Sequence, residues 1–121
     1  MNIQIPFPLL APLPQPFDLL QYKVRIKEFD QWSQSQFGLV SVRKLVKARA
    51  DFVDFVLLNV WQHAELHKES GLSLLAVGGY GRNELHPASD IDLLLLSPKK
   101  LLQTTSDKIS TFLTVLWDLK F

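Results

Sequence analysis

The chain has 121 residues, of which 47% are hydrophobic, and its formal net charge at pH 7 is +1. This length fits one domain or part of one, and it is sufficient to bury a core. A nearly balanced charge gives no overall attraction to nucleic acid or to a membrane surface, and the absence of cysteine excludes disulfides and thiolate metal sites. No apolar run reaches the length of a membrane span. We therefore expect a cytoplasmic protein without a nucleic-acid or membrane partner.

Residues 1–16 contain five of the seven prolines. Proline fixes its own backbone and favours extended conformations, so this leader is predicted to be extended, polyproline-like or loosely ordered. A packed or frayed leader is favoured over a regulatory arm. The segment has no basic start and is interrupted by prolines, which makes it a poor signal peptide.

Two helices are predicted within residues 17–70, which we treat as an N-terminal helical segment. The first runs from Phe17 to about Gln36, with Asp18 in its first turn, and its imperfect apolar stripe comprises Leu19, Leu20, Val24, Ile26 and Phe29. The second runs from a Ser41 cap to about His67. Its stripe repeats every three or four residues and comprises Val42, Leu45, Val46, Phe52, Val53, Val56, Leu57, Val60, Trp61 and Ala64.

Three polar residues of the second helix require an explanation. Arg49 falls on the apolar stripe, so we expect it to pair with a carboxylate of a neighbouring element, such as Asp51 or Asp54, or to extend its head group to solvent. His63 and His67 are four residues apart, but the glutamate of a zinc-protease helix is not at the required position. Exposed histidines near a helix C-terminus are the better interpretation.

The stretch from Leu72 to Leu96, LSLLAVGGYGRNELHPASDIDLLLL, is the most informative part of the chain. It is predicted to form a buried strand over residues 72–77, a glycine turn, a short helix over residues 80–85, a loop and a second strand over residues 90–96. Gly78 and Gly79 allow a ligand to approach the backbone closely, and free N–H groups at the start of a helix favour phosphate.

Asp90 and Asp92 open the second strand and are two residues apart, so they project from the same face. Leu94 and Leu96 share that face, whereas the intervening residues occupy the other. Two carboxylates on one face repel each other, and a divalent cation relieves that cost. Magnesium prefers oxygen ligands and binds through one or two carboxylates together with substrate phosphates. The pattern therefore predicts a site for a metal-bound polyphosphate.

Other interpretations of this stretch fit less well. The dinucleotide fingerprint fails because Glu84 stands where its last glycine should be, and no P-loop is present. Leucines follow Asp92 where a calcium loop requires oxygen ligands. A hairpin turn with two solvated aspartates remains an alternative, but these aspartates lead directly into an apolar strand.

The motif resembles the nucleotidyltransferase superfamily of DNA polymerase β type. The fuller string GGYGRNELHPASDIDLLLL closely resembles the catalytic domain of bacterial PII uridylyltransferase/uridylyl-removing enzymes, and the resemblance extends from about Phe37 onward. It implies that Gly78 and Gly79 hold the nucleoside triphosphate and that Asp90 and Asp92 bind Mg²⁺. Glutamine synthetase adenylyltransferases are similar around the same motif.

The resemblance implies magnesium-dependent transfer of UMP from UTP to a tyrosine of the PII protein, a regulator of nitrogen metabolism, with release of diphosphate. Arg82 is positioned to reach a phosphate or to form a salt bridge, and Ser89 to bind a phosphate or to shape the loop. The alternatives are a protein adenylyltransferase and a non-catalytic fragment that retains nucleotide binding.

The last predicted helix begins near Ser106, which is a candidate cap, and its buried stripe is Ile109, Phe112, Leu113 and Leu116. In the resembled superfamily a third carboxylate comes from a later strand, and Asp107 and Asp118 have no strand context. We therefore expect residues 71–121 to form an incomplete nucleotidyltransferase core and the isolated chain to be inactive. The predicted fold class is α/β, with N-terminal helices followed by a truncated polymerase-β-type core and a small sheet.

Overall fold

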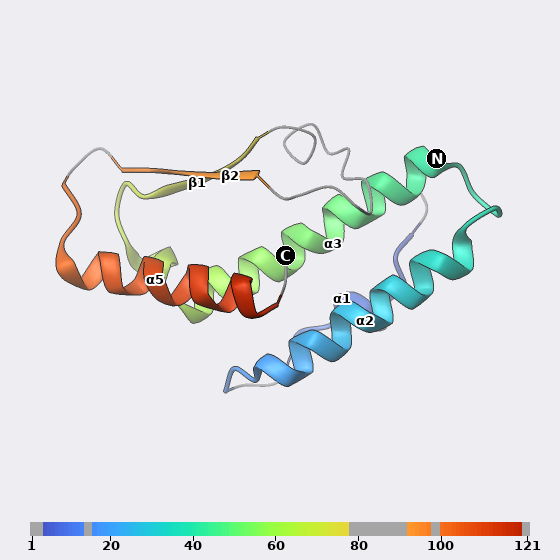
Figure 1. The fold of residues 1–121 in the computed structure, drawn as a ribbon, viewed down its shortest axis with the longest axis horizontal. Coiled ribbons are helices and arrows are strands. Elements are labelled where there is room, and N and C mark those ends of the chain that lie inside the picture. The colour runs from blue at the N-terminus through green and yellow to red at the C-terminus, as the bar shows by residue number, and fades with distance from the viewer. Residues whose placement is uncertain (1–3, 14–15, 78–91, 98–99, 120–121) are drawn as a thin grey trace.

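A computed structural model describes residues 4–13, 16–77, 92–97 and 100–119 of the chain. Figure 1 shows α2 and α3 side by side, with the leader along α2 and the two strands and α5 on the other side of α3. None of the described helices is both long and apolar enough to cross a membrane. The elements in chain order are α1 (Phe7–Leu10), α2 (Leu19–Gln36), α3 (Val42–His63), the short 3₁₀ helix η1 (Leu66–Lys68), β1 (Ser73–Val77), β2 (Asp92–Leu96) and α5 (Gln103–Asp118).

Helix α2 confirms the first predicted helix. Asp18 is its N-cap rather than part of its first turn, and the Asp18 carboxylate accepts a hydrogen bond from the backbone N–H of Leu20 at 3.0 Å. The helix ends at Gln36, and Gly38 then adopts a φ of +87°, a conformation that glycine reaches without a steric penalty. The turn between α2 and α3 therefore depends on the positive φ that Gly38 adopts just after α2 ends.

Helix α3 confirms the second predicted helix, but its predicted end is wrong. The Ser41 hydroxyl accepts a hydrogen bond from the backbone N–H of Lys44 at 3.4 Å, so Ser41 is the cap as expected. The helix stops at His63 rather than near His67. Glu65 has a φ of +62°, which cannot continue a right-handed helix, and η1 follows directly.

The hydrophobic core is formed by buried residues of the leader, α2, α3, η1 and α5. The rings of Phe29 on α2 and Phe52 on α3 stack with their centroids 4.2 Å apart, and both are buried. Trp61 on α3 meets Phe112 on α5 edge to face at 5.4 Å. These two aromatic pairs connect α3 to a helix on each side.

The described part of the leader, residues 4–13 and 16, is packed, as predicted, but it is not extended throughout. Residues 7–10 form the helix α1, and Leu9 on α1 is buried together with Ile5 and Leu13. Arg25 on α2 donates hydrogen bonds to the carbonyl oxygens of Leu9 at 3.1 Å and Ala11 at 2.8 Å. These bonds satisfy backbone groups at the end of a helix too short to satisfy its own.

The predicted stripes identify most, but not all, of the buried residues. Leu20 and Val24 on α2 and Val42 on α3 are exposed, so their assignment to the core was wrong. Tyr22 is buried in place of the aliphatic residues expected on α2. A tyrosine is hidden from a search for strictly apolar periodicity because it carries a hydroxyl group on a large apolar ring.

Strands β1 and β2 pair antiparallel, in a register that runs from Ser73 opposite Leu96 to Val77 opposite Asp92. Leu74 and Leu93 pack against the helical core, whereas Leu94 and Leu96 are exposed. This alternation confirms the predicted division of β2 into two faces.

Helix α5 confirms the last predicted helix with two corrections. It begins at Gln103, with Leu102 at the N-cap position and no side-chain cap, so Ser106 lies inside the helix and is not its cap. Phe112 and Leu116 are buried as predicted, but Leu113 is 51% exposed. Together the helices and the small antiparallel sheet confirm the predicted α/β class.

We predict that Phe112→Ala destabilises the fold by about 3–5 kcal/mol because it leaves a cavity between α3 and α5. Leu113→Ala is the matched control on the exposed face of the same helix and should change the free energy of unfolding by about 0.5 kcal/mol or less. Urea unfolding followed by circular dichroism measures both values. Equal losses in the two variants would contradict the described packing of α5.

Candidate functional site

The two strands pair the residue before the predicted glycine turn with the second aspartate of the motif at one rung of the sheet. Val77, which immediately precedes Gly78, is the register partner of Asp92. The chain therefore leaves β1 and enters β2 at directly opposed positions. In an antiparallel pair such residues have Cα atoms about 4.5–5.5 Å apart.

Asp92 is the one predicted site residue that belongs to a described element, where it is the first residue of β2. The predicted short helix over residues 80–85 lies outside the described residues. So do the five other predicted site residues, which are Gly78, Gly79, Arg82, Ser89 and Asp90. Their predicted roles stay predictions.

The inner face of the sheet attaches the motif to the helices. Leu74 on β1 and Leu93 on β2 pack against the core cluster, and Leu72 joins them just before β1. A hollow of about 590 Å³ lies between this face and α3, where Asp54 and Trp61 line its helix side. The walls are mostly apolar, so the space between the strands and α3 is lined mainly by hydrophobic side chains.

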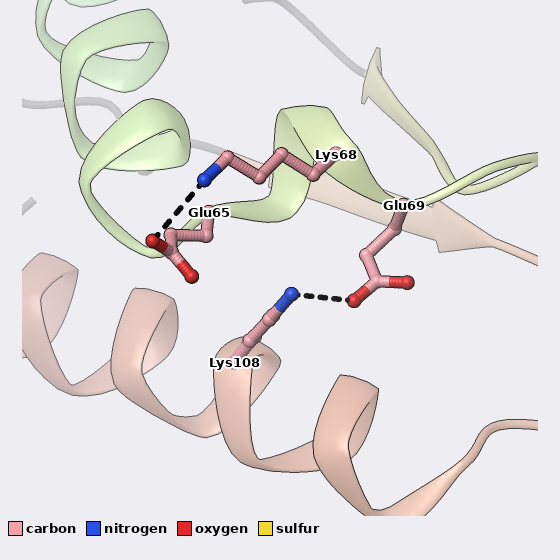
Figure 2. A network of polar contacts seen from close by, with 4 residues as sticks. All are labelled: Glu65, Lys68, Glu69 and Lys108. Carbon is pink, nitrogen blue, oxygen red and sulfur yellow. Dashed lines mark hydrogen bonds and ion pairs between the residues drawn. The ribbon is translucent and has the colours of Figure 1, made fainter.

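A second attachment lies just before β1, at η1. Leu66 is fully buried there, and the Nζ atom of Lys108 on α5 donates a hydrogen bond to Glu69 Oε1 at 2.9 Å (Figure 2). Figure 2 also shows a second pair, Lys68 with Glu65 at 3.4 Å, whose side chains are more exposed than those of Glu69 and Lys108. The Glu69–Lys108 pair joins residues 39 positions apart and so fixes the start of the strand unit to α5.

The Glu69–Lys108 hydrogen bond shifts the titration of both groups. The hydrogen bond from Lys108 holds the pKa of the Glu69 carboxyl below its usual range, and the Thr105 hydroxyl contributes in the same direction. The same hydrogen bond raises the pKa of Lys108, with a smaller contribution from the charge of Glu65. The sequence gives no sign of this pair, because a lysine and a glutamate so far apart in the chain carry no periodic signal.

Arg49 pairs with a carboxylate of a neighbouring element, as predicted, but the partner is Asp30 on α2. Arg49 Nη1 lies 3.9 Å from Asp30 Oδ1, whereas Asp51 forms an ion pair with Lys47 on its own helix. Asp51 was a wrong suggestion because it lies on the same helix, two residues from Arg49. Burial raises the pKa of the Asp30 carboxyl, and the charge of Arg49 opposes this shift.

The histidines do not form a metal site in the part of the chain that the structure describes. His63 and His67 are exposed as predicted, and the His63 ring stacks on Phe17 with centroids 3.9 Å apart. Among the described residues no group of three histidines, cysteines or carboxylates could hold a metal ion. The predicted metal ligand Asp90 lies outside that part.

Residues 62–120 match the family model of the nucleotidyltransferase domain. The matched range starts at the end of α3 and includes η1, both strands and α5, which is the unit that holds the motif. The chain therefore belongs to a nucleotidyltransferase family, a class of transferase enzymes.

Its curated relatives are named bifunctional uridylyltransferase/uridylyl-removing enzymes. The protein from Vibrio parahaemolyticus is 42% identical over 117 residues, which cover 93% of this chain and 13% of the relative. The protein from Photobacterium profundum is 48% identical over 96 residues, covering 78% of this chain and 11% of the relative. The protein from Vibrio cholerae is 44% identical over 99 residues, which cover 81% of this chain and 11% of the relative.

The chain spans 11–13% of the length of these relatives. No solved structure matches it significantly. The family assignment therefore depends on the sequence relatives and the domain match, and it agrees with the resemblance drawn from the motif.

We predict that the Glu69–Lys108 pair makes stability depend on pH in the acid range. Because the Glu69 pKa is lowered in the folded state, its contribution is present above the unfolded pKa and is lost as pH falls through the folded value. Lys108→Gln replaces the charged donor with a shorter neutral amide, so the variant should lose less stability than the wild type between about pH 6 and pH 3.

Lys68→Gln is the matched control, because the Lys68–Glu65 pair is more exposed and three residues apart on one turn. Urea midpoints measured across this pH range should be parallel for the control and the wild type. A Lys108→Gln curve that also runs parallel to the wild type would show that this hydrogen bond does not fix the strand unit in solution.

Proposed function

We propose that the segment between β1 and β2 is the catalytic centre of a magnesium-dependent uridylyltransferase. In this reaction a tyrosine of a PII nitrogen-regulatory protein receives UMP from UTP, and diphosphate is released. The observation that carries the proposal is the Gly78-Gly79 to Asp90-x-Asp92 motif in the sequence, and the pairing of Val77, the residue before it, with Asp92 supports it. The names of the relatives supply the uridylyl group, and the sequence resemblance supplies the acceptor.

The reaction is a displacement at the α-phosphorus of UTP. The phenolic oxygen of the acceptor tyrosine forms a bond to the α-phosphorus, while the bond from that phosphorus to the bridging oxygen of the β-phosphate breaks. Diphosphate leaves with the electron pair of that bond, and the phenolic proton passes to solvent. The protein contributes positioning and charge neutralisation, which dominate catalysis of phosphoryl transfer.

The donor atoms of the motif fit magnesium. Asp90 and Asp92 offer carboxylate oxygens, the ligands that a hard cation prefers, and Asp92 begins a strand attached to the helical core. When bound, magnesium supplies positive charge that polarises the α-phosphate and lowers the pKa of an attacking hydroxyl.

The remaining motif residues bind phosphate in this proposal. Backbone N–H groups at Gly78 and Gly79 hold the β- and γ-phosphates, where the absence of a side chain permits close approach. Arg82 neutralises a phosphate charge, and Ser89 donates a hydrogen bond to one. A cytoplasmic location follows from the substrate, since the reaction consumes a nucleoside triphosphate. We assign only the transfer reaction to this chain.

A protein adenylyltransferase of the glutamine synthetase type is the second candidate, because its members share the glycine and aspartate pattern. The two functions differ in the base that is bound. With Mg²⁺ present, we expect UTP to bind at least tenfold more tightly than ATP in a calorimetric titration, a difference of about 1.4 kcal/mol. Tighter binding of ATP would favour the adenylyltransferase, and binding of neither would contradict the site.

We predict that, in the full-length protein, Asp90→Asn and Asp92→Asn each lower the rate of uridylyl transfer by at least about a hundredfold, because each removes a ligand charge while preserving side-chain shape. Transfer is measured as covalent incorporation of UMP into the PII protein by mass spectrometry. Asp118→Asn, at the end of α5, is the control and should retain wild-type activity. Near-normal transfer in both motif variants would exclude the metal assignment.

A further inference from the structure

The turn between α2 and α3 exposes a group of apolar side chains. Phe37 is 71% exposed, Leu39 77% and Val42 51%, and we call these three residues the apolar tip. The turn lies at one end of the long axis of the molecule (Figure 1), and a Cβ atom on Gly38 would meet no atom beyond its chain neighbours within 4 Å. Exposed apolar residues that lie together, rather than singly, mark surfaces that meet another molecule or a membrane.

The backbone of this turn is satisfied by its own hydrogen bonds. The N–H group of Phe37 donates to the carbonyl oxygen of Gln34 at 3.1 Å. The N–H groups of Leu39 and Val40 both donate to the carbonyl oxygen of Gln36, at 3.0 Å and 3.2 Å. Unpaired backbone polar groups are costly in an apolar medium, so the tip can enter such a medium without leaving these three donors unpaired.

The stretch that contains the tip is basic. Residues 31–50 hold four of the chain's 13 basic residues and none of its 12 acidic residues, so the rest of the chain is net acidic. The four basic residues are Arg43, Lys44, Lys47 and Arg49. Two of them form ion pairs with Asp51 and Asp30, whereas Arg43 and Lys44, which directly follow the tip, have no carboxylate partner among the described residues.

An apolar tip beside unpaired cations matches the layered chemistry of an anionic bilayer surface. Binding to such a surface increases with the apolar area that is buried and with the attraction between basic side chains and anionic lipids. Three side chains on one turn are few for a protein–protein interface, to which each partner contributes about 20–30 residues. A bilayer is fluid and therefore needs no matching shape, so a small tip suits lipid better than a protein surface.

We propose that the α2–α3 turn makes reversible contact with an anionic membrane surface. The apolar tip enters the boundary between head groups and acyl chains, and Arg43 and Lys44 pair with lipid phosphates. The expectation of no membrane partner came from the net charge of +1, which averages this basic stretch with an acidic remainder. The cytoplasmic leaflet carries anionic lipids, so this contact agrees with the proposed cytoplasmic location. The proposal is independent of the nucleotide chemistry assigned to the loop after β1.

The test is co-sedimentation of the full-length protein with vesicles of phosphatidylcholine, either alone or mixed with about 30% phosphatidylglycerol. We expect at least about tenfold stronger partitioning onto the anionic vesicles, and weaker partitioning when salt rises from about 0.1 M to about 0.5 M, since salt screens the attraction. No binding to the anionic vesicles, equal binding to both compositions, or binding that salt does not weaken would overturn the proposal.

A first pair of double variants tests the apolar tip. Phe37→Ser combined with Leu39→Ser should weaken partitioning onto anionic vesicles at least about tenfold, because it removes most of the apolar area that enters the bilayer. Leu20→Ser combined with Val24→Ser is the matched control at exposed apolar positions of α2, and its partitioning should stay within about twofold of the wild type. Equal losses in the two double variants would overturn the proposal, as would unchanged binding in the first.

A second pair tests the cations. Arg43→Gln combined with Lys44→Gln should weaken partitioning at least about tenfold, because each basic residue near an anionic surface adds to the attraction. Lys23→Gln combined with Lys27→Gln, at two exposed lysines of α2, removes the same charge and should have an effect of about twofold or less. Equal losses in the two pairs would show only a general attraction of basic residues to the vesicles, and would overturn the proposal.

An acidic protein segment is the competing occupant of this surface, and poly-L-glutamate is the probe for it. Poly-L-glutamate offers carboxylates but no apolar phase, so we expect it to bind at least about tenfold more weakly than anionic vesicles at equal concentrations of charge. Equal or tighter binding of poly-L-glutamate that Arg43→Gln with Lys44→Gln abolishes would show that the turn docks an acidic protein segment. The membrane assignment would then be wrong.

Discussion

The antiparallel pairing of Val77 with Asp92 is the constraint on which the proposed site depends. The pairing brings together the two ends of the loop between β1 and β2. The conformational entropy lost in bringing the glycine and aspartate halves of the motif together is therefore part of the entropy lost on folding. Two strands alone are marginal in water, and here Leu74 and Leu93 attach them to the helices. The helical core is therefore part of the functional argument, because it is the surface against which Leu74 and Leu93 pack.

The attachments differ in physical kind and in the conditions that weaken them. The apolar contacts of the inner sheet face are insensitive to pH. The Glu69–Lys108 hydrogen bond holds the chain just before β1 and is lost when the carboxylate is protonated. On the outer face, Leu94 and Leu96 remain exposed on the strand that begins with Asp92. The site is thus supported from the helical side.

The sequence predicted the long helices and both strands because their signals are local. Ser41 caps α3, Gly38 follows the end of α2, and the alternation of Leu93 and Leu94 separates the two faces of β2.

The wrong predictions were of two kinds. The positive φ of Glu65 ended α3 early although glutamate favours helices, and the burial of Tyr22 depends on where the leader packs. For the candidate site, the backbone of Asp92 was placed as predicted, whereas the partner of Arg49 needed the tertiary arrangement of α2 and α3.

The central claim is that the motif directs attack at the α-phosphorus of UTP. Two parallel reactions of the full-length protein with the PII protein, one with UTP labelled with ³²P at the α-phosphate and one with the label at the γ-phosphate, test this claim most directly. The account predicts that label from the α-position becomes covalently attached to the acceptor protein and that label from the γ-position is released as diphosphate. Transfer of the γ-label to the acceptor would contradict it, because that result would identify a phosphotransferase.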